Sequence, residues 1–218
     1  TDNGGLNLYD YENDRFIKYT MNLDNPSGLR GNKILTIFED SKGRIWLGTT
    51  SGLTKMVSFG GRETSPEFIH YTVEDGLPTN TIHGILEDDH GNLWISTNNG
   101  LSKFDPDRKT FINFNEGDGL QDKEFSVNAC YKDIVSGEFY FGGINGYNVF
   151  HPDSISLNKI KPKVVLTNLR IFNQNIDIGQ EINGEIPLKK SITLTDELWI
   201  SYFFDNFTIE FSALHFIA

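Results

Sequence analysis

Two pairs of adjacent carboxylates, Glu39 with Asp40 and Glu87 with Asp88, are the side chains whose types and spacing could support catalysis. Glycoside hydrolysis uses two such carboxylates on either side of the bond that is cleaved. Both pairs, however, occupy the same place in a repeated pattern, whereas an active site normally interrupts a repeat. A strand-end or turn role shared by each repeat therefore fits these acids better, and we expect no catalytic residue in this chain.

A histidine beside acids raises the question of a metal site. His90 lies next to Asp88 and Asp89 in the stretch DDHG, but the matching stretch one repeat earlier reads DSKG and has no histidine. We therefore interpret His90 as a surface turn residue. The chain also has no GxSxG, HExxH or P-loop motif.

Residues 113–124, NFNEGDGLQDKE, resemble a calcium-binding loop in part. Asn113, Asn115 and Glu124 fall at positions 1, 3 and 12 of such a loop. Asp118 stands where a glycine is needed, and Gly117 stands where an oxygen ligand is expected. We therefore expect no metal site here, and no cofactor elsewhere.

The composition narrows the function classes. The net charge of −11 comes from scattered acids, and such a surface repels a phosphate backbone, so binding of nucleic acid is not expected. The single cysteine, Cys130, allows no disulfide within the chain. No apolar run reaches the roughly 18 residues that span a membrane. Aromatic residues at 13% together with 21 glycines favour short strands and tight turns.

The elements that position these residues repeat along the chain. When residues 28–57 are aligned with residues 76–105, a shift of 48, thirteen of the thirty positions are identical. Residues 137–147 form a looser third copy, and GGLNLYD at 4–10 resembles NGLSKFD at 99–105. The second copy reads as strands at 82–89, 93–97, 101–105 and 110–114. Four short strands in a unit of 40–50 residues are typical of a β-propeller blade.

We therefore predict an all-β fold in which residues 1–157 form about three four-stranded blades plus a half-blade of a larger propeller. The first strand of each blade would line the central channel. Large aromatics on the second strand would fill the space between blades, at Trp46, Trp94 and Tyr140. Glycines at the turn into the third strand would have positive φ, at Gly52, Gly100 and Gly146.

A ligand would bind at one end of such a propeller, where the loops that lead into the first strands meet the turns between the second and third strands. Amides, hydroxyls and a few cations at this rim suit sugar hydroxyls or carboxylates. The rim would contain Arg30, Asn32, Ser51, Thr79, Asn80, Asn98, Asn99, Lys123 and Asn145. Asn32 and Asn80 belong to the repeat and can instead cap turns, so our ligand-binding candidates are Arg30, Ser51, Asn98, Asn99 and Asn145.

The repeat ends at residues 150–155, and a connector at 158–163 leads into a different β-rich region. Strand-like runs follow, VVLTNLRIFN, SITLTDELWIS and NFTIEFSAL, bounded by Gly, Asn and Asp. We predict that residues 158–218 begin an immunoglobulin-like β-sandwich. Because a sandwich needs around 90–100 residues, only part of it would be present.

The ordered motifs resemble a known family. GRIWLGTTSGL resembles the two-component regulator propeller repeat. The succession GEFYFGGINGYNVFHPDSI, PKVVLTNLRIFN and NFTIEFSALHF resembles the end of a sensor propeller and the start of the Y_Y_Y domain in hybrid two-component sensors of Bacteroides-like bacteria. The resemblance covers essentially the whole chain, but the tyrosines that name the domain and all phosphotransfer residues lie outside it.

The resemblance implies a non-enzymatic segment in the periplasmic region of an inner-membrane protein. Such sensors detect products of polysaccharide breakdown and control genes for glycan use. The implied partners are an oligosaccharide and a second copy of the full-length protein, with membrane attachment only through a downstream region and no nucleic acid bound by this segment. Two alternatives stay open: a propeller lyase or glycosidase, and a protein-interaction scaffold.

Overall fold

The structure is a computed structural model, and it describes residues 3–22, 24–58, 66–155, 163–195 and 197–214. The chain divides into two compact units, Thr1–Ser156 and Leu157–Ala218. The predicted connector at 158–163 lies outside the described residues except for its last residue. Strands and short 3-10 helices make up the regular structure of the described residues, so the predicted all-β class is confirmed.

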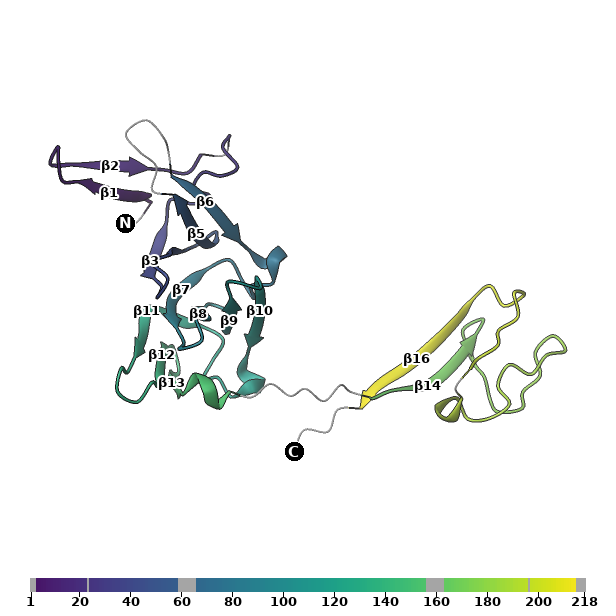
Figure 1. Cartoon of the computed structure of the whole chain (residues 1–218). Helices are drawn as coiled ribbons and strands as arrows, with labels where there is room; N and C mark the ends of the chain where they lie inside the picture. Colours follow the sequence, from purple (N-terminus) through teal and green to yellow (C-terminus); the bar gives the residue numbers. More distant parts are fainter. Residues whose placement is uncertain (1–2, 23, 59–65, 156–162, 196, 215–218) are drawn as a thin grey trace. The chain divides into compact units, whose positions relative to one another are not determined.

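Two antiparallel four-stranded sheets form the centre of the first unit (Figure 1), and in each the strands follow one another in chain order. The strand positions predicted for the second sheet at 93–97, 101–105 and 110–114 are confirmed. The first sheet contains β3 (Ile34–Glu39), β4 (Ile45–Thr49), β5 (Gly52–Ser58) and β6 (Glu67–Tyr71). The second sheet contains β7 (Ile82–Glu87), β8 (Leu93–Thr97), β9 (Leu101–Asp105) and β10 (Thr110–Phe114).

The third sheet has three strands in the described residues, whereas the prediction gave four strands to each of about three blades. It contains β11 (Phe125–Lys132), β12 (Phe139–Gly143) and β13 (Gly146–Phe150). After β13 the chain enters a 3-10 helix, Pro152–Ser154, capped by His151. Pro152 has no N–H to give to a sheet, which favours a turn at this point. The half-blade expected at the start is a hairpin of β1 (Leu6–Asp10) and β2 (Arg15–Tyr19).

The sheets meet through their first strands, because β7 contacts both β3 and β11, and β11 also reaches β3. Successive sheets that converge on their first strands are arranged as propeller blades around an axis. Each first strand also carries a register shift against its neighbour, between Ile34 and Thr36, between Ile82 and Gly84, and between Phe125 and Cys130.

The core of the first unit lies between the blades. Trp46 is fully buried against Phe104 of the next blade, with ring centroids 5.8 Å apart. Trp94 is buried in the same way against Phe139 and Phe150 of the third sheet. Tyr140 occupies the matching position but is only half-buried, because no further blade covers it in the described residues.

The second unit contains one three-stranded antiparallel sheet, of β14 (Lys163–Ile171), β15 (Gln174–Asn175) and β16 (Phe207–Leu214). Its core gathers on one face of β14, where Leu169 and Ile171 are fully buried. The strand expected at 191–201 is absent from the described residues there, so that prediction was wrong. A 3-10 helix, Ile192–Leu194, stands in its place, and the Thr195 hydroxyl donates to the Ser191 carbonyl to close the turn.

Candidate functional site: the rim of the propeller unit

The predicted rim is built first from the turns between second and third strands. In the first blade the Thr49 hydroxyl donates to the Gly52 carbonyl at 2.9 Å and accepts from the Ser51 N–H. Thr97 makes the same pair of bonds with Gly100 and Asn99 in the second blade. The structure gives the predicted positive φ to Gly52, Gly100 and Gly146. A Cβ at Gly52 would also clash with the Tyr71 carbonyl, and a Cβ at Gly100 would clash with the Phe114 carbonyl. Both carbonyls belong to the outer strand of the same blade.

The loops that lead into the first strands form the other half of the rim. Each begins with Gly-Leu, and we call them the Gly-Leu loops; they cover residues 28–33, 76–81 and 119–124. Each loop touches the turn of its own blade. Ser51 packs so closely on Gly31 that a Cβ there would lie 2.8 Å from its Oγ, and Asn99 Nδ2 donates to the Pro78 carbonyl at 3.2 Å. In the third sheet Asn145 Nδ2 donates to Asp122 Oδ2 at 2.6 Å.

The predicted rim residues differ in what their side chains contact. Asn32 and Asn80 hold the chain locally, because each side-chain oxygen accepts a backbone N–H, from Met21 and from Val73. The side chains of Arg30, Asn98 and Lys123 are exposed. A third set, Ser51, Asn99 and Asn145, contacts the Gly-Leu loops as described above. Thr79 is half-buried.

Three further residues hold the rim and were not predicted from the sequence. His70 on β6, Asn113 on β10 and Asn148 on β13 each bond the carbonyl of the glycine that opens the Gly-Leu loop of their own blade. The glycine carbonyls are those of Gly28, Gly76 and Gly119, at 2.8, 2.9 and 3.1 Å. His70 and Asn113 occupy matching outer strands, so an alignment extended to these strands would have shown the shared position.

The carboxylate pairs lie at the opposite end of the blades and do not form a catalytic pair. Asp88 is buried, and its Oδ2 accepts from Trp94 Nε1 at 3.0 Å and from Asn92 Nδ2 at 3.0 Å. Burial by itself raises the pKa of Asp88, but hydrogen bonds from Asn92 and Trp94 and the charge of Lys103 outweigh it and lower the pKa. Glu87 points to the preceding blade, where it accepts from both the N–H and the hydroxyl of Ser41.

The two stretches considered as metal sites, DDHG and residues 113–124, have side chains that make hydrogen bonds within the chain. His90 Nε2 lies 3.0 Å from Asp153 Oδ1, while Asp88 beside it is buried under Trp94, so the stretch DDHG does not converge on one point. Asn115 caps a 3-10 helix, Glu116–Asp118, and Asp118 accepts the Asn115 N–H. No group of three His, Cys, Asp or Glu side chains among the described residues could hold a metal ion.

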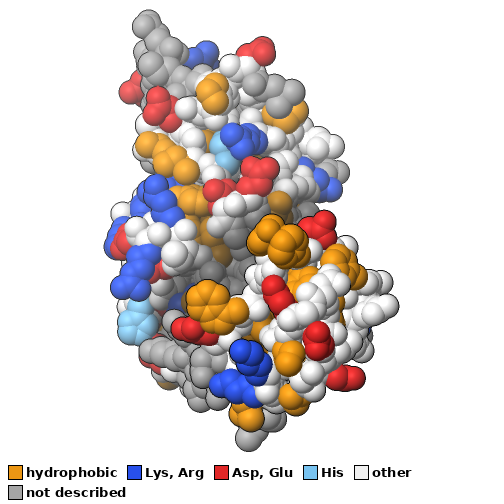
Figure 2. Space-filling view, turned by 90° about the vertical axis from the view of Figure 1, so that its right-hand side faces the viewer, with side chains coloured by type: hydrophobic (Ala, Val, Ile, Leu, Met, Phe, Trp, Pro, Cys, Tyr) orange, Lys and Arg blue, Asp and Glu red, His pale blue; other side chains and the backbone are white. Residues whose placement is uncertain are grey.

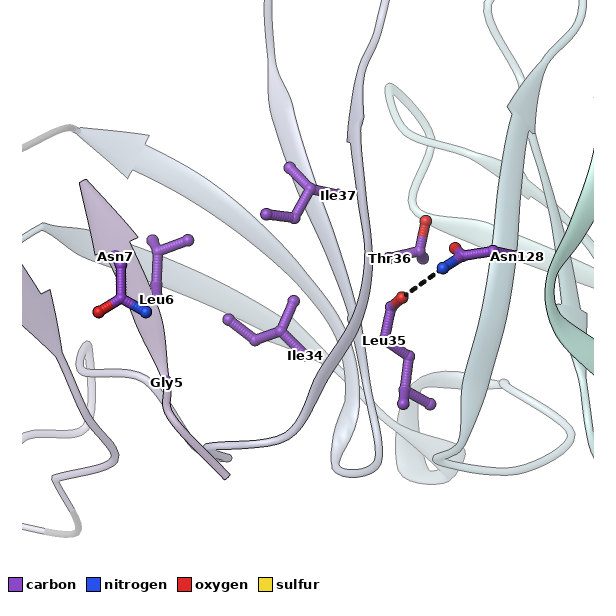
Figure 3. A pocket seen from close by; sticks show the side chains of 8 residues that line it. All are labelled: Gly5, Leu6, Asn7, Ile34, Leu35, Thr36, Ile37 and Asn128. Atoms are coloured by element: carbon purple, nitrogen blue, oxygen red, sulfur yellow. Dashed lines mark hydrogen bonds between the residues drawn. The ribbon is translucent and has the colours of Figure 1, made fainter. Parts of the chain in front are cut away.

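A cavity of about 410 Å³ lies beside β3 (Figure 3). Asn128, on the irregular part of β11, donates from Nδ2 to the Leu35 carbonyl at 3.1 Å and so joins the first strands of two blades. None of the rim candidates lines this cavity. Its lining is Gly5, Leu6, Asn7, Ile34, Leu35, Thr36, Ile37 and Asn128.

Figure 2 shows acidic and basic side chains interspersed on the face it presents, with hydrophobic side chains between them. Among the described residues there is no helix long and apolar enough to cross a membrane.

Residues 28–51 and 76–99 match the family model described as the two component regulator propeller. Each match runs from a Gly-Leu loop to the turn between the second and third strands. These are two component regulator propeller repeats. The repeats thus contain the first two strands of the two complete blades and both halves of their rim.

The chain is also similar to a histidine kinase and to the extracellular domain assigned to a hybrid two component system. The chain is 31% identical to "Histidine kinase P4" of Formosa agariphila, over 98% of the chain and 18% of that protein. It is 30% identical to the extracellular domain assigned to a hybrid two component system, BT3049, of B. thetaiotaomicron, with a TM-score of 0.66. That match covers 83% of this chain and 24% of the solved one. The chain therefore spans about a fifth to a quarter of these relatives.

Proposed function

We propose that this chain is a ligand-sensing part of the extracellular region of a hybrid two-component system and that it has no catalytic activity of its own. The observation that carries the proposal is the similarity to the extracellular domain assigned to BT3049, at 30% identity over most of this chain. The carboxylate pairs support the non-enzymatic part, because Asp88 is committed to Trp94 and Glu87 to Ser41.

We further propose that the ligand is an oligosaccharide that contacts the rim. Arg30, Asn98 and Lys123 are exposed there, next to the turn residues Ser51 and Asn99. Guanidinium, amide and hydroxyl groups can bond sugar hydroxyls, and the two cations can pair with a sugar carboxylate or sulfate.

In the longer protein, the proposed location is the periplasm and the proposed output is transcription of genes for glycan use. Signalling would require two copies whose relative arrangement depends on the ligand. A ligand shifts such an equilibrium only by its difference in affinity for the two arrangements.

Titration calorimetry of the chain against a panel of neutral and acidic oligosaccharides tests the ligand. Arg30→Ala and Asn98→Ala should weaken binding. Arg108→Ala is the matched control, because Arg108 is exposed on the turn between β9 and β10, at the opposite end of the blade. Equal losses in Arg30→Ala and Arg108→Ala would contradict a rim site.

Product analysis tests the absence of catalysis. Each oligosaccharide that binds is incubated with the chain and analysed for new reducing ends and for unsaturated sugars. We expect intact ligand. Turnover that survives purification of the chain and is lost in Glu87→Gln or Asp88→Asn would overturn the non-enzymatic proposal in favour of a lyase or glycosidase.

A further inference from the structure

The glycine carbonyl at the start of each Gly-Leu loop is held by a side chain from an outer strand of the same blade. In the second blade, Asn113 Nδ2 donates to the Gly76 carbonyl at 2.9 Å, and Asn113 Oδ1 accepts from the Ser102 hydroxyl at 2.7 Å. Asn113 and Ser102 face each other across β10 and β9. The amide thus acts as a donor on one side and an acceptor on the other.

His70 takes the place of this amide in the first blade. Its Nε2 lies 2.8 Å from the Gly28 carbonyl, and its Nδ1 lies 3.0 Å from the Thr54 hydroxyl. His70 and Thr54 also face each other across their strands, as Asn113 and Ser102 do. Because a carbonyl can only accept, Nε2 must carry the proton, and the neutral ring then accepts at Nδ1 from Thr54.

Protonation of His70 would disturb this arrangement, whereas an asparagine at the same place cannot be protonated. The second N–H, at Nδ1, would point at the hydroxyl of Thr54, which is buried and would have to turn its own hydrogen away. On β6, Phe68 flanks the ring with centroids 6.3 Å apart and offers no countercharge. On the loop, the charge of Arg30 opposes a second positive charge. Burial first, and then Arg30, lower the pKa of His70, while its bond to the Gly28 carbonyl opposes them.

We propose that His70 is a pH-sensitive positioning residue, which holds Gly28, and through it Arg30 two residues later, in place when neutral and loosens this part of the rim when protonated. The protonated ring is more stable in water than between Thr54 and the loop, so acid favours the conformation in which the ring has left its site. For each unit by which the pKa of the ring in its site lies below the pKa of the ring in water, the protonated ring favours leaving the site by about tenfold. The effect on ligand affinity rests on the proposed function, since it requires that Arg30 contacts the ligand.

The chain supplies its own matched control, because the second blade performs the same task with Asn113. Two variants exchange the residues, His70→Asn and Asn113→His. Hydrogen exchange of the peptide covering residues 26–33 is measured at pH 7.5 and 5.5 and corrected for the intrinsic pH dependence of exchange. The Gly28 N–H, which donates to the Asn25 carbonyl at 2.9 Å, is a reporter within this peptide.

In the wild type, protection of residues 26–33 should fall by about threefold or more at pH 5.5, and His70→Asn should abolish this dependence. Asn113→His should transfer the dependence to the peptide covering residues 74–81. Nitrogen NMR of the imidazole should show the Nε2–H tautomer of His70 at pH 7.5. The other tautomer, or equal protection at both pH values in the wild type and in His70→Asn, would overturn the proposal.

These readouts need no ligand, so they separate the two proposals. If no oligosaccharide binds but protection of residues 26–33 still depends on His70, the proposed function fails and the positioning role stands. If an oligosaccharide binds through Arg30 with the same affinity at pH 7.5 and 5.5, and protection is also unchanged, the positioning role fails and the rim site stands.

Discussion

The indole Nε1 of Trp94 donates a hydrogen bond of 3.0 Å to the buried carboxylate of Asp88, six residues earlier in the chain. Trp46 and Asp40 make the same bond in the preceding blade, at 2.7 Å. The carboxylate in turn accepts the backbone N–H of the residues that close the turn between the first two strands. One pair of side chains therefore links the turn of a blade to the aromatic core that it shares with its neighbour.

Replacement of Trp94 should separate the packing from the hydrogen bond. Trp94→Ala should lower the free energy of unfolding by about 3–5 kcal/mol, the usual cost of removing a buried large aromatic. Trp94→Phe keeps most of the packing but leaves Asp88 without one donor, and should cost about 1–3 kcal/mol. Urea denaturation followed by circular dichroism measures both. Trp199→Ala is the control, because Trp199 is 82% exposed; a loss in Trp94→Ala no larger than in this control would contradict the framework role.

The Asp88 carboxylate should also make the free energy of unfolding depend on pH. Because the folded state lowers the pKa of Asp88, the ionised form contributes stability above the unfolded-state pKa of about 3.9, and this contribution is lost as the pH falls through the folded-state pKa. Asp88→Asn should therefore be less stable than the wild type at pH 7, and the difference should narrow between pH 4 and pH 3. Asp89→Asn, at an exposed neighbour, should show little change at pH 7. A difference for Asp88→Asn that stays constant with pH would rule out an ionised Asp88.

Two cross-strand pairs show how neighbouring blades fit together. Thr36 faces Gly48 in the first blade, and Gly84 faces Ser96 in the second. The glycine of the pair is therefore on the second strand in the first blade and on the first strand in the second blade. A Cβ on Gly48 would lie 2.5 Å from the Thr36 methyl and 2.8 Å from the Cγ2 methyl of Ile82 in the next blade. Gly48→Ser should cost about 1–3 kcal/mol.

Thr36→Gly should recover only part of that cost, because Ile82 still occupies the space. The two single variants and the double variant form a double-mutant cycle, measured by urea denaturation. We expect a favourable coupling between positions 36 and 48. Strictly additive losses would show that the clash with Thr36 is relieved in another way.

His83 should destabilise the chain at mildly acidic pH. Neither of its ring nitrogens has a hydrogen-bond partner, and burial lowers its pKa, while the charge of Glu124 opposes this. A lowered histidine pKa means that stability is complete above about pH 6.5 and is lost as the pH falls toward the folded-state value. The matched position in the first blade is Leu35. His83→Leu should therefore raise the free energy of unfolding by about 1 kcal/mol and reduce its fall between pH 7.5 and 5.5.

The reciprocal variant, Leu35→His, should introduce the same kind of loss into the first blade. Denaturant midpoints at the two pH values measure both variants. If His83→Leu is destabilising at pH 5.5 as well as at pH 7.5, the imidazole has a partner that compensates its burial.

The sequence allowed the second blade to be predicted strand by strand, since its turns carry glycines at fixed offsets and its strands are short and apolar. The third sheet matched the repeat less closely, and in the described residues the chain turns at Pro152 directly after the third strand. The expected strand at 191–201 alternates in polarity, but alternation does not specify a pairing partner. In the structure Leu198 and Ile200 pack on the core of the second unit outside any strand.

The loops and turns that meet at one end of the blades could be recognised from the sequence, but the hydrogen bonds that each of their residues makes could not. Asn99 and Asn145 were predicted as ligand contacts, and in the structure their amides also bond the Gly-Leu loops. The link between His70 and Gly28 joins residues 42 positions apart, and it depends on the register of β5 and β6. Register of this kind follows from packing, so the repeat could show that His70 and Asn113 share a position but not what they bond.

The buried aromatics between blades also determine how the propeller unit unfolds. Trp46 belongs to the first blade and Trp94 to the second, yet each completes the core of the blade that follows it. Loss of the second blade would expose both indoles at once. In a nearest-neighbour description of repeat proteins, most of the stability then resides in the interfaces and little in any single sheet. The blades should consequently melt together in one cooperative transition, with the hairpin of β1 and β2 fraying first.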